Sequence, residues 1–298
     1  MLEKRKLGNS DLYISPISFG CMSLQNGAPE NTKLLHAALD GGINFFDTAD
    51  LYDKGANESL IGEAFKHKRQ DVIIATKGGN QWRPDGSGWD WNPAKEYILA
   101  AANESLRRLQ TDYIDLYQIH GGTINDPLDE TYEALQILQQ QGKIRYWGVS
   151  SIRPNVVRYW VEKGGITSVM SQYSLLDRRP EETIFPLLQE HGTGVLVRGA
   201  LAQGLLAGKP AKPYLEHTEE TVKQVADAVA QNSTDGHTPS GIAINWALHH
   251  SAVTSVVAGI RTANQLTEAL VAMAQPPMDQ KAALLTQTAP ALTYQQHR

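Results

Sequence analysis

Short apolar runs alternate with longer, more polar segments along most of the chain. The apolar runs are typical of β-strands, and they cover residues 17–20, 43–46, 72–76, 113–119, 145–149, 168–172, 194–197 and 254–257. The segments between them carry helical patterns, near residues 32–40, 57–66, 93–109, 128–141, 154–162, 180–191, 219–231, 239–249 and 263–273. This order predicts strand–helix units repeated along the chain.

Eight strand–helix units are the number that a (β/α)8 barrel needs, whereas a doubly wound sheet usually has fewer strands. Prolines stand at the expected first helical turns, where they are well tolerated, at Pro93, Pro154, Pro180 and Pro239. The chain has 298 residues and no linker rich in Pro, Ser or Gly. We therefore predict an α/β fold, a single TIM-barrel domain over residues 1–298, with its active site at the C-terminal face of the strands.

Composition and charge narrow the possible functions. Hydrophobic residues make up 41% of the chain, and no apolar stretch approaches the ~20 residues that a membrane span requires. The net charge is −5 and the basic residues are scattered, so a nucleic-acid partner is not expected. The first residues lack the apolar segment of a signal peptide, and Cys21 is the single cysteine, which favours a cytoplasmic location. No segment indicates an oligomeric state.

Four polar residues stand at or just past the ends of the apolar runs. Asp47, Lys77 and His120 each follow a predicted strand directly, and Tyr52 lies shortly after Asp47. Because the C-terminal ends of barrel strands meet at one face, we expect these side chains to form one active site. Each alone would be ordinary, as a helix cap, an aromatic, a solvated amine or a core imidazole. Their joint placement favours catalysis.

These side chains suit proton transfer to a carbonyl oxygen. Reduction of an aldehyde or ketone needs a hydride donor at the carbonyl carbon and a proton donor near its oxygen, where negative charge develops. The Tyr52 hydroxyl can donate that proton, and the Lys77 ammonium would favour the resulting phenolate. Asp47 would pair with Lys77 and keep it charged and in place, and His120 would orient the carbonyl oxygen.

At these positions the sequence resembles the aldo-keto reductase superfamily, from Arg5 to about Leu270. The segments that carry the resemblance are DTADLY at 47–52, ATK at 75–77 and DLYQIH at 115–120, with further agreement at 6–10, 20–22, 142–145 and 148–150. The resemblance implies reduction of a small-molecule carbonyl substrate with NADPH bound across the barrel mouth. It implies no Rossmann fold, and the chain has no Gly-x-Gly-x-x-Gly fingerprint.

The resemblance also implies contacts to the nicotinamide end of the cofactor. Ser150 and Gln172 match residues that hold the carboxamide, and Gly20 and Met22 lie on the segment that borders the ring. Ser151 stands where an Asn is common in the family, so the carboxamide contact is expected to be weakened, or remade by the shorter side chain.

The rest of the cofactor is expected to lie against two further segments. Residues 199–206 match the loop around the pyrophosphate, where backbone N–H groups can face anionic oxygens, with contacts expected at Gly199, Ala200, Leu201, Gln203 and Gly204. Residues 259–265 match the adenosine-phosphate segment, with contacts expected at Gly259, Arg261 and Gln265. The fork of donors on Arg261 could pair with a 2′-phosphate, which favours NADPH over NADH.

Two other positions depart from the family pattern. Arg198 lies where an aromatic residue stacks on the nicotinamide, and its guanidinium plane can also stack. Ala269 replaces an Asn near the adenine. Neither departure touches the four catalytic candidates.

Alternatives to a reductase stay open on the sequence alone. A barrel of this kind could be a regulatory or redox-sensing subunit that binds NADPH with little turnover, or a cofactor-free lyase or isomerase. Trp82, Trp89 and Trp91 follow the third predicted strand, and they could form an aromatic wall for an apolar carbonyl substrate or only a self-packed loop. The histidines show no metal-ligand spacing, so no metal site is expected.

Overall fold

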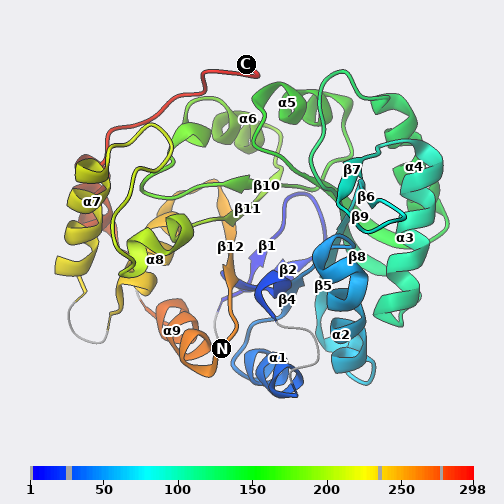
Figure 1. Ribbon diagram of the computed structural model, residues 1–298, viewed down its shortest axis with the longest axis horizontal. Coiled ribbons are helices and arrows are strands. Elements are labelled where there is room, and N and C mark those ends of the chain that lie inside the picture. The colour runs from blue at the N-terminus through cyan, green and yellow to red at the C-terminus, as the bar shows by residue number, and fades with distance from the viewer. Residues whose placement is uncertain (1–2, 25–28, 234–236, 276–277) are drawn as a thin grey trace.

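Eight parallel strands close into a barrel that helices surround (Figure 1). The computed structural model describes residues 3–24, 29–233, 237–275 and 278–298. The barrel strands are β3 (Ile17–Gly20), β4 (Phe45–Asp47), β5 (Ile73–Gly78), β8 (Ile114–Ile119), β9 (Ile144–Ser150), β10 (Ser168–Gln172), β11 (Gly194–Arg198) and β12 (Val253–Gly259). Around the barrel they follow the order β10–β11–β12–β3–β4–β5–β8–β9. The predicted (β/α)8 fold class is confirmed.

The helices pack on the outside of the barrel (Figure 1). They are α1 (Glu30–Asp40), α2 (Ala56–Phe65), α3 (Lys95–Leu109), α4 (Leu128–Gln140), α5 (Pro154–Lys163), α6 (Ile184–Glu190), α7 (Glu219–Gln231), α8 (Pro239–His249), α9 (Ala263–Met273) and α10 (Asp279–Thr288). The sequence did not predict α10. It also placed the start of α6 too early, because Pro180 lies in a separate 3-10 turn and Pro186 is the proline in the first turn of α6.

The strands are buried on both faces, as their nearly continuous apolar sequences require. Side chains such as Phe46 and Val149 belong to the core between the strands and the helices. Others, including Phe45, Leu116 and Leu196, form a second cluster inside the barrel, in which every side chain is at most 2% exposed. Only the ends of the strands are therefore available for polar chemistry.

An N-terminal hairpin, which the sequence did not predict, closes the far end of the barrel. Its strands are β1 (Arg5–Lys6) and β2 (Tyr13–Ile14), and Figure 1 shows both in the middle of the ring. Leu7, Leu12 and Ile14 join the cluster inside the barrel. Strands of two residues are too short for alternation to reveal them. The hairpin, residues 5–14, leaves the C-terminal face as the open end.

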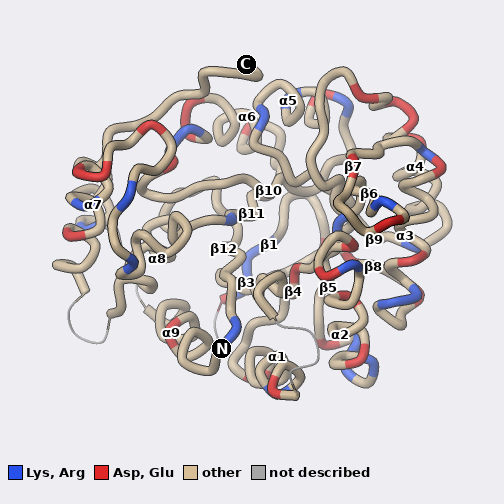
Figure 2. Tube along the Cα trace, in the orientation of Figure 1, with Lys and Arg blue, Asp and Glu red and all other residues tan. Residues whose placement is uncertain are grey.

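The outer surface mixes both signs of charge, and Figure 2 shows acidic and basic residues interspersed over the outer helices. Many pair within one helix, as Lys223 does with Asp227 on α7. Across the described part of the chain, no helix is both long enough and apolar enough to span a bilayer.

Candidate active site

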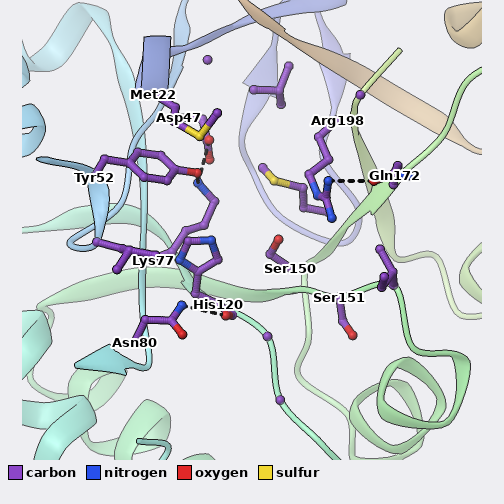
Figure 3. Close-up of a pocket in the computed structure, with 18 of the residues that line it drawn as sticks. Met22, Asp47, Tyr52, Lys77, Asn80, His120, Ser150, Ser151, Gln172 and Arg198 are labelled. Carbon is purple, nitrogen blue, oxygen red and sulfur yellow. Dashed lines mark hydrogen bonds and ion pairs between the residues drawn. The ribbon is translucent and has the colours of Figure 1, made fainter. Parts of the chain in front are cut away.

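The open end of the barrel holds a cavity of about 840 Å³. Six barrel strands end in a residue that lines it, namely Gly20, Asp47, Ser150, Gln172, Arg198 and Gly259. Lys77 is the last residue but one of β5, and His120 follows β8 directly. All four predicted catalytic residues line this cavity (Figure 3).

Lys77 lies at the centre of the four predicted catalytic residues and is 1% exposed. Its ammonium donates to Asp47 Oδ2 at 2.7 Å and to the Thr48 carbonyl oxygen at 2.7 Å. A third hydrogen bond, of 3.2 Å, joins Lys77 Nζ to the Tyr52 hydroxyl. The three donors of the ammonium are therefore all used, and they fix the nitrogen between a carboxylate and a phenol.

The charges of this group compensate one another. Burial by itself would lower the pKa of Lys77, but Asp47, and after it Tyr52, more than offset this effect and raise the pKa above its usual value. Burial raises the pKa of Asp47, while the Lys77 charge and the hydrogen bonds from Lys77 and Gln118 act against that rise. Gln118 Nε2 lies 3.3 Å from Asp47 Oδ1. The site thus keeps a charged ammonium beside the Tyr52 hydroxyl.

Tyr52 begins a short turn, Tyr52–Gly55, between β4 and α2. Asp53, Lys54 and Gly55 all have left-handed backbone conformations, with φ of 49°, 52° and 87°. A Cβ on Gly55 would lie 2.7 Å from the Arg108 side chain, and Arg108 forms an ion pair of 2.6 Å with the fully buried Glu58. The turn is therefore packed onto a buried ion pair, which holds Tyr52 against Lys77.

His120 lies edge-on to Tyr52, with ring centroids 5.9 Å apart. Burial, helped by the charges of Lys77 and Arg198, lowers its pKa to about 3. The imidazole is therefore neutral near pH 7, with one N–H donor and one acceptor nitrogen. Its Nδ1 is buried and has no partner among the described residues. Asn80, which the sequence analysis missed, holds the His120 carbonyl oxygen at 3.1 Å.

Two polar residues of the site were open to detection from the sequence. Gln118 is fully buried and stands two residues before His120 near the end of a predicted strand, so its side chain leaves the chain on the same face. Asn80 follows the end of β5 by two residues. Polar residues within or just beyond a buried strand were the available signal.

The cofactor candidates divide into two sets. Those that line the cavity with the catalytic group are Gly20, Met22, Ser150, Ser151, Gln172, Arg198, Gly199, Gln203 and Gly259. Those outside its lining are Ala200, Leu201, Gly204, Arg261 and Gln265. Ala200, Leu201 and Gly204 lie in the same loop as Gly199, whereas Arg261 is exposed just before α9. There, Gln265 Oε1 accepts a hydrogen bond from the Arg261 backbone N–H at 3.0 Å.

The cavity lining fits a nicotinamide cofactor. Gly20 and Gly259 place no side chain of their own in the cavity, and a Cβ on Gly20 would lie 3.1 Å from the Ala258 carbonyl oxygen. Ser150 and Gln172 offer polar groups on the opposite strands. Beyond β11, Gly199, Gln203 and Gly204 have positive φ of 75°, 61° and 92°, so the loop turns tightly beside the cavity that Gly199 and Gln203 line. Among the described residues, no group of three or more His, Cys, Asp or Glu could hold a metal ion.

The tryptophan-containing segment after β5 forms a second hairpin, with strands β6 (Asn80–Trp82) and β7 (Trp89–Trp91). Trp89 and Trp91 line the cavity. Trp91 Nε1 donates to Asp126 Oδ2 at 2.9 Å, which ties the hairpin to the loop after β8. Trp82 is not among the residues that line the cavity, and its Nε1 donates to the Leu51 carbonyl oxygen at 3.2 Å. Two of the three tryptophans thus form an aromatic wall.

Comparison with known proteins agrees with this geometry. The sequence model of the Aldo/keto reductase family matches residues 16–288. YqkF of Bacillus subtilis, named an uncharacterized oxidoreductase, is 46% identical over 276 residues, which make up 90% of each chain. An NADH-specific methylglyoxal reductase of Escherichia coli is 29% identical, with 98% of this chain and 99% of that protein covered.

A solved structure is similar over the whole chain. The holo form of aldo-keto reductase AKR11C1 from Bacillus halodurans superposes with a TM-score of 0.94 at 45% identity, and both chains are covered completely. The backbone that places the strand ends around the cavity is therefore similar to that of a solved structure.

Proposed function

The chain belongs to the aldo/keto reductase family and is an NAD(P)H-dependent oxidoreductase, and from that premise we propose that it reduces aldehydes or ketones to alcohols with NADPH. The observation that carries the proposal is the 3.2 Å contact between Lys77 Nζ and the Tyr52 hydroxyl at the cavity wall. A buried cation beside a phenol is the arrangement that proton donation to a carbonyl oxygen needs.

Tyr52 is the proton donor in this mechanism. The bound cofactor supplies the hydride that the carbonyl carbon receives. As negative charge develops on the carbonyl oxygen, the Tyr52 hydroxyl gives up its proton, so that the product is an alcohol and the side chain is a phenolate. Lys77 stabilises this phenolate, Asp47 holds Lys77 in place, and solvent returns the proton.

His120 orients the substrate. Because burial and nearby positive charges lower its pKa to about 3, the ring has an N–H to donate but no positive charge near neutral pH. It can therefore hold the carbonyl oxygen by a hydrogen bond while Tyr52 remains the acid. The edge-on contact with Tyr52 supports a shared position for the oxygen between the two rings.

The cofactor is proposed to lie along the strand ends from β9 to β12. Ser150, Ser151 and Gln172 would hold its carboxamide, and the loop after β11 would hold its pyrophosphate. Family membership by itself does not select NADPH, because one relative is named as NADH-specific. The preference for NADPH rests on Arg261, whose exposed guanidinium can bind a 2′-phosphate through two parallel hydrogen bonds.

The test is NADPH consumption, followed by absorbance, with aromatic and aliphatic aldehydes, ketones and sugars as substrates. We expect turnover by the wild type and a loss of roughly 10²- to 10⁴-fold in Tyr52→Phe, with NADPH binding retained in a fluorescence titration. Tyr146→Phe is the matched control. Tyr146 lies near the start of β9, where its hydroxyl accepts a hydrogen bond from the Asp11 backbone N–H, and the variant should keep the full rate.

Two results would overturn the proposal. A Tyr52→Phe protein with undiminished turnover would remove the assigned proton donor. A wild type that binds NADPH but reduces no carbonyl of the panel would favour a regulatory subunit.

A further inference from the structure

Both ends of the Gln172 side-chain amide are engaged. Its Nε2 donates to Asp177 Oδ2 at 2.8 Å and to the Tyr214 hydroxyl at 3.2 Å. Its Oε1 accepts a hydrogen bond from Arg198 Nη1 at 3.0 Å, on the cavity side (Figure 3). The nitrogen thus faces a buried carboxylate and the Tyr214 hydroxyl, whereas the oxygen faces Arg198, a residue that lines the cavity.

Asp177 on one side and Arg198 on the other fix the orientation of this amide. Its side chain is fully buried, and a carboxylate accepts hydrogen bonds but has none to donate to Oε1. Arg179 provides the opposite charge through two bonds, from Nε to Oδ1 at 2.7 Å and from Nη2 to Oδ2 at 2.8 Å. Turning the Gln172 amide over would place its oxygen against a carboxylate and lose a charge-assisted hydrogen bond. The orientation therefore follows from chemistry.

The segment that carries Asp177 is itself held in place. The backbone groups of Ser174 and Asp177 hydrogen-bond to each other in both directions, at 3.2 and 2.9 Å. The Arg179 guanidinium lies 5.3 Å from the ring centre of Tyr294, whose side chain is buried. Neither partner in the ion pair can move without disturbing packed neighbours, so the carboxylate is a rigid reference for Gln172.

We propose that Asp177 is a positioning residue that, through Gln172, gives the cavity a hydrogen-bond acceptor for the amide N–H group of a nicotinamide carboxamide. The inference rests on the proposed function, in which Gln172 contacts that carboxamide. Because an amide oxygen has two lone pairs, Gln172 Oε1 accepts from the carboxamide while it keeps its bond to Arg198. The site consequently selects a ring substituent that donates a hydrogen bond over one that only accepts.

A purely structural ion pair would behave differently. If Asp177 and Arg179 only stabilised the fold, their loss would weaken the binding of every nicotinamide cofactor by a similar factor. A positioning role instead changes the ratio between two cofactors that differ in the donor on the ring. The ratio of dissociation constants is therefore the informative quantity, and it requires no catalysis.

The experiment compares NADP⁺ with its acetylpyridine analogue, in which an acetyl group replaces the carboxamide and removes the N–H donor. Dissociation constants are measured by quenching of tryptophan fluorescence. In the wild type we expect NADP⁺ to bind about 3- to 10-fold more tightly, the worth of one hydrogen bond. In Asp177→Asn the new amide can donate as well as accept, so Arg198 alone still favours the original orientation of Gln172, and the ratio should fall measurably toward one. An unchanged ratio in folded Asp177→Asn would overturn the inference.

A second variant decides the question if Asp177→Asn does not fold. Gln172→Met keeps the size of the side chain and removes the acceptor, so the ratio should also fall to about one, and a ratio equal to that of the wild type would overturn the inference. Asp115→Asn is the matched control, because Asp115 is also buried and paired with two arginines, Arg69 and Arg145, near the start of β8. It should lower the melting temperature without changing the ratio.

Failure of the inference is distinguishable from failure of the proposed function. A wild type that reduces carbonyls but binds both cofactors equally refutes only the role given to Asp177. A wild type that binds neither cofactor refutes both proposals.

Discussion

The two halves of the site hold their cations differently. The proposed catalytic half lies at the ends of β4, β5 and β8, and the proposed cofactor half lies at the ends of β9 to β12 and in the loops beyond. Lys77 is 1% exposed and makes three hydrogen bonds to neighbours. Arg261 is exposed beyond β12, and its backbone N–H rather than its guanidinium bonds to Gln265. The polar contacts of Lys77 are therefore formed without any ligand, whereas the Arg261 guanidinium in the second half is exposed to solvent.

The two cations differ because one is buried within the barrel and the other is exposed to solvent. Strand neighbours in a closed barrel have fixed register, and Asp47 is paired with Ala75 two residues before Lys77. A buried ammonium must be compensated by the fold itself, because an uncompensated buried charge is strongly destabilising. An exposed guanidinium carries no such requirement. Substitutions in the two halves should therefore fail in different ways.

The largest effect is expected from Lys77→Met. It removes the cation beside the Tyr52 hydroxyl and leaves Asp47 buried without its partner. We expect carbonyl reduction to fall by roughly 10²- to 10⁴-fold, measured in a single turnover with NADPH already bound. Lys68→Met, at a half-exposed site 4.0 Å from Asp40, should keep the wild-type rate. A Lys77→Met protein that reduces carbonyls at that rate would mean that the buried cation has no catalytic use.

A smaller effect, confined to binding, is expected from Arg261→Ala. The loss of a charged hydrogen-bonding group should weaken NADPH binding by about 10- to 100-fold and leave NADH binding unchanged, as measured by fluorescence titration of both cofactors. Arg107→Ala, on the exposed face of α3, should alter neither constant. Equal weakening of NADPH and NADH would show that Arg261 does not read the 2′-phosphate.

The smallest effect is expected on the pH profile of kcat/KM, which should not change when His120 is replaced. Because burial and nearby positive charges lower the pKa of His120 to about 3, the imidazole gains its proton only as the pH falls toward that value. It should remain neutral between about pH 5 and 8, where an ordinary histidine titrates. The pH profile of kcat/KM should therefore have the same shape in the wild type and in the slower His120→Asn. A limb near pH 6.5 that disappears in the variant would contradict this expectation.

The strand-borne part of the molecule was within reach of sequence reasoning. A polar residue at the end of an apolar run is conspicuous, and the parallel topology then brings all such residues to one face. This is how Asp47, Lys77 and His120 could be assigned to one cavity before the structure was known. Tyr52 lies outside a strand, and it was accessible only through the spacing of the DTADLY segment.

The remaining features depend on contacts that no local pattern records. Asp177 reaches Gln172 only because a turn at residues 174–177 brings the chain back beside β10. Asn80 acts on the backbone of His120, 40 residues away. The short strands of the N-terminal hairpin give no period to read, and they are stabilised by the barrel interior rather than by their own propensity.

The N-terminal hairpin also has a consequence for how the protein is synthesised. Leu7, Leu12 and Ile14 are synthesised before their partners inside the barrel, whose buried members extend along the chain to Leu196. At the usual pace of translation, roughly 10 to 40 s separate the synthesis of Ile14 from that of Leu196. Throughout this interval the nascent chain carries an apolar segment without its full cover, so the hairpin stays exposed to water until the later strands have been made.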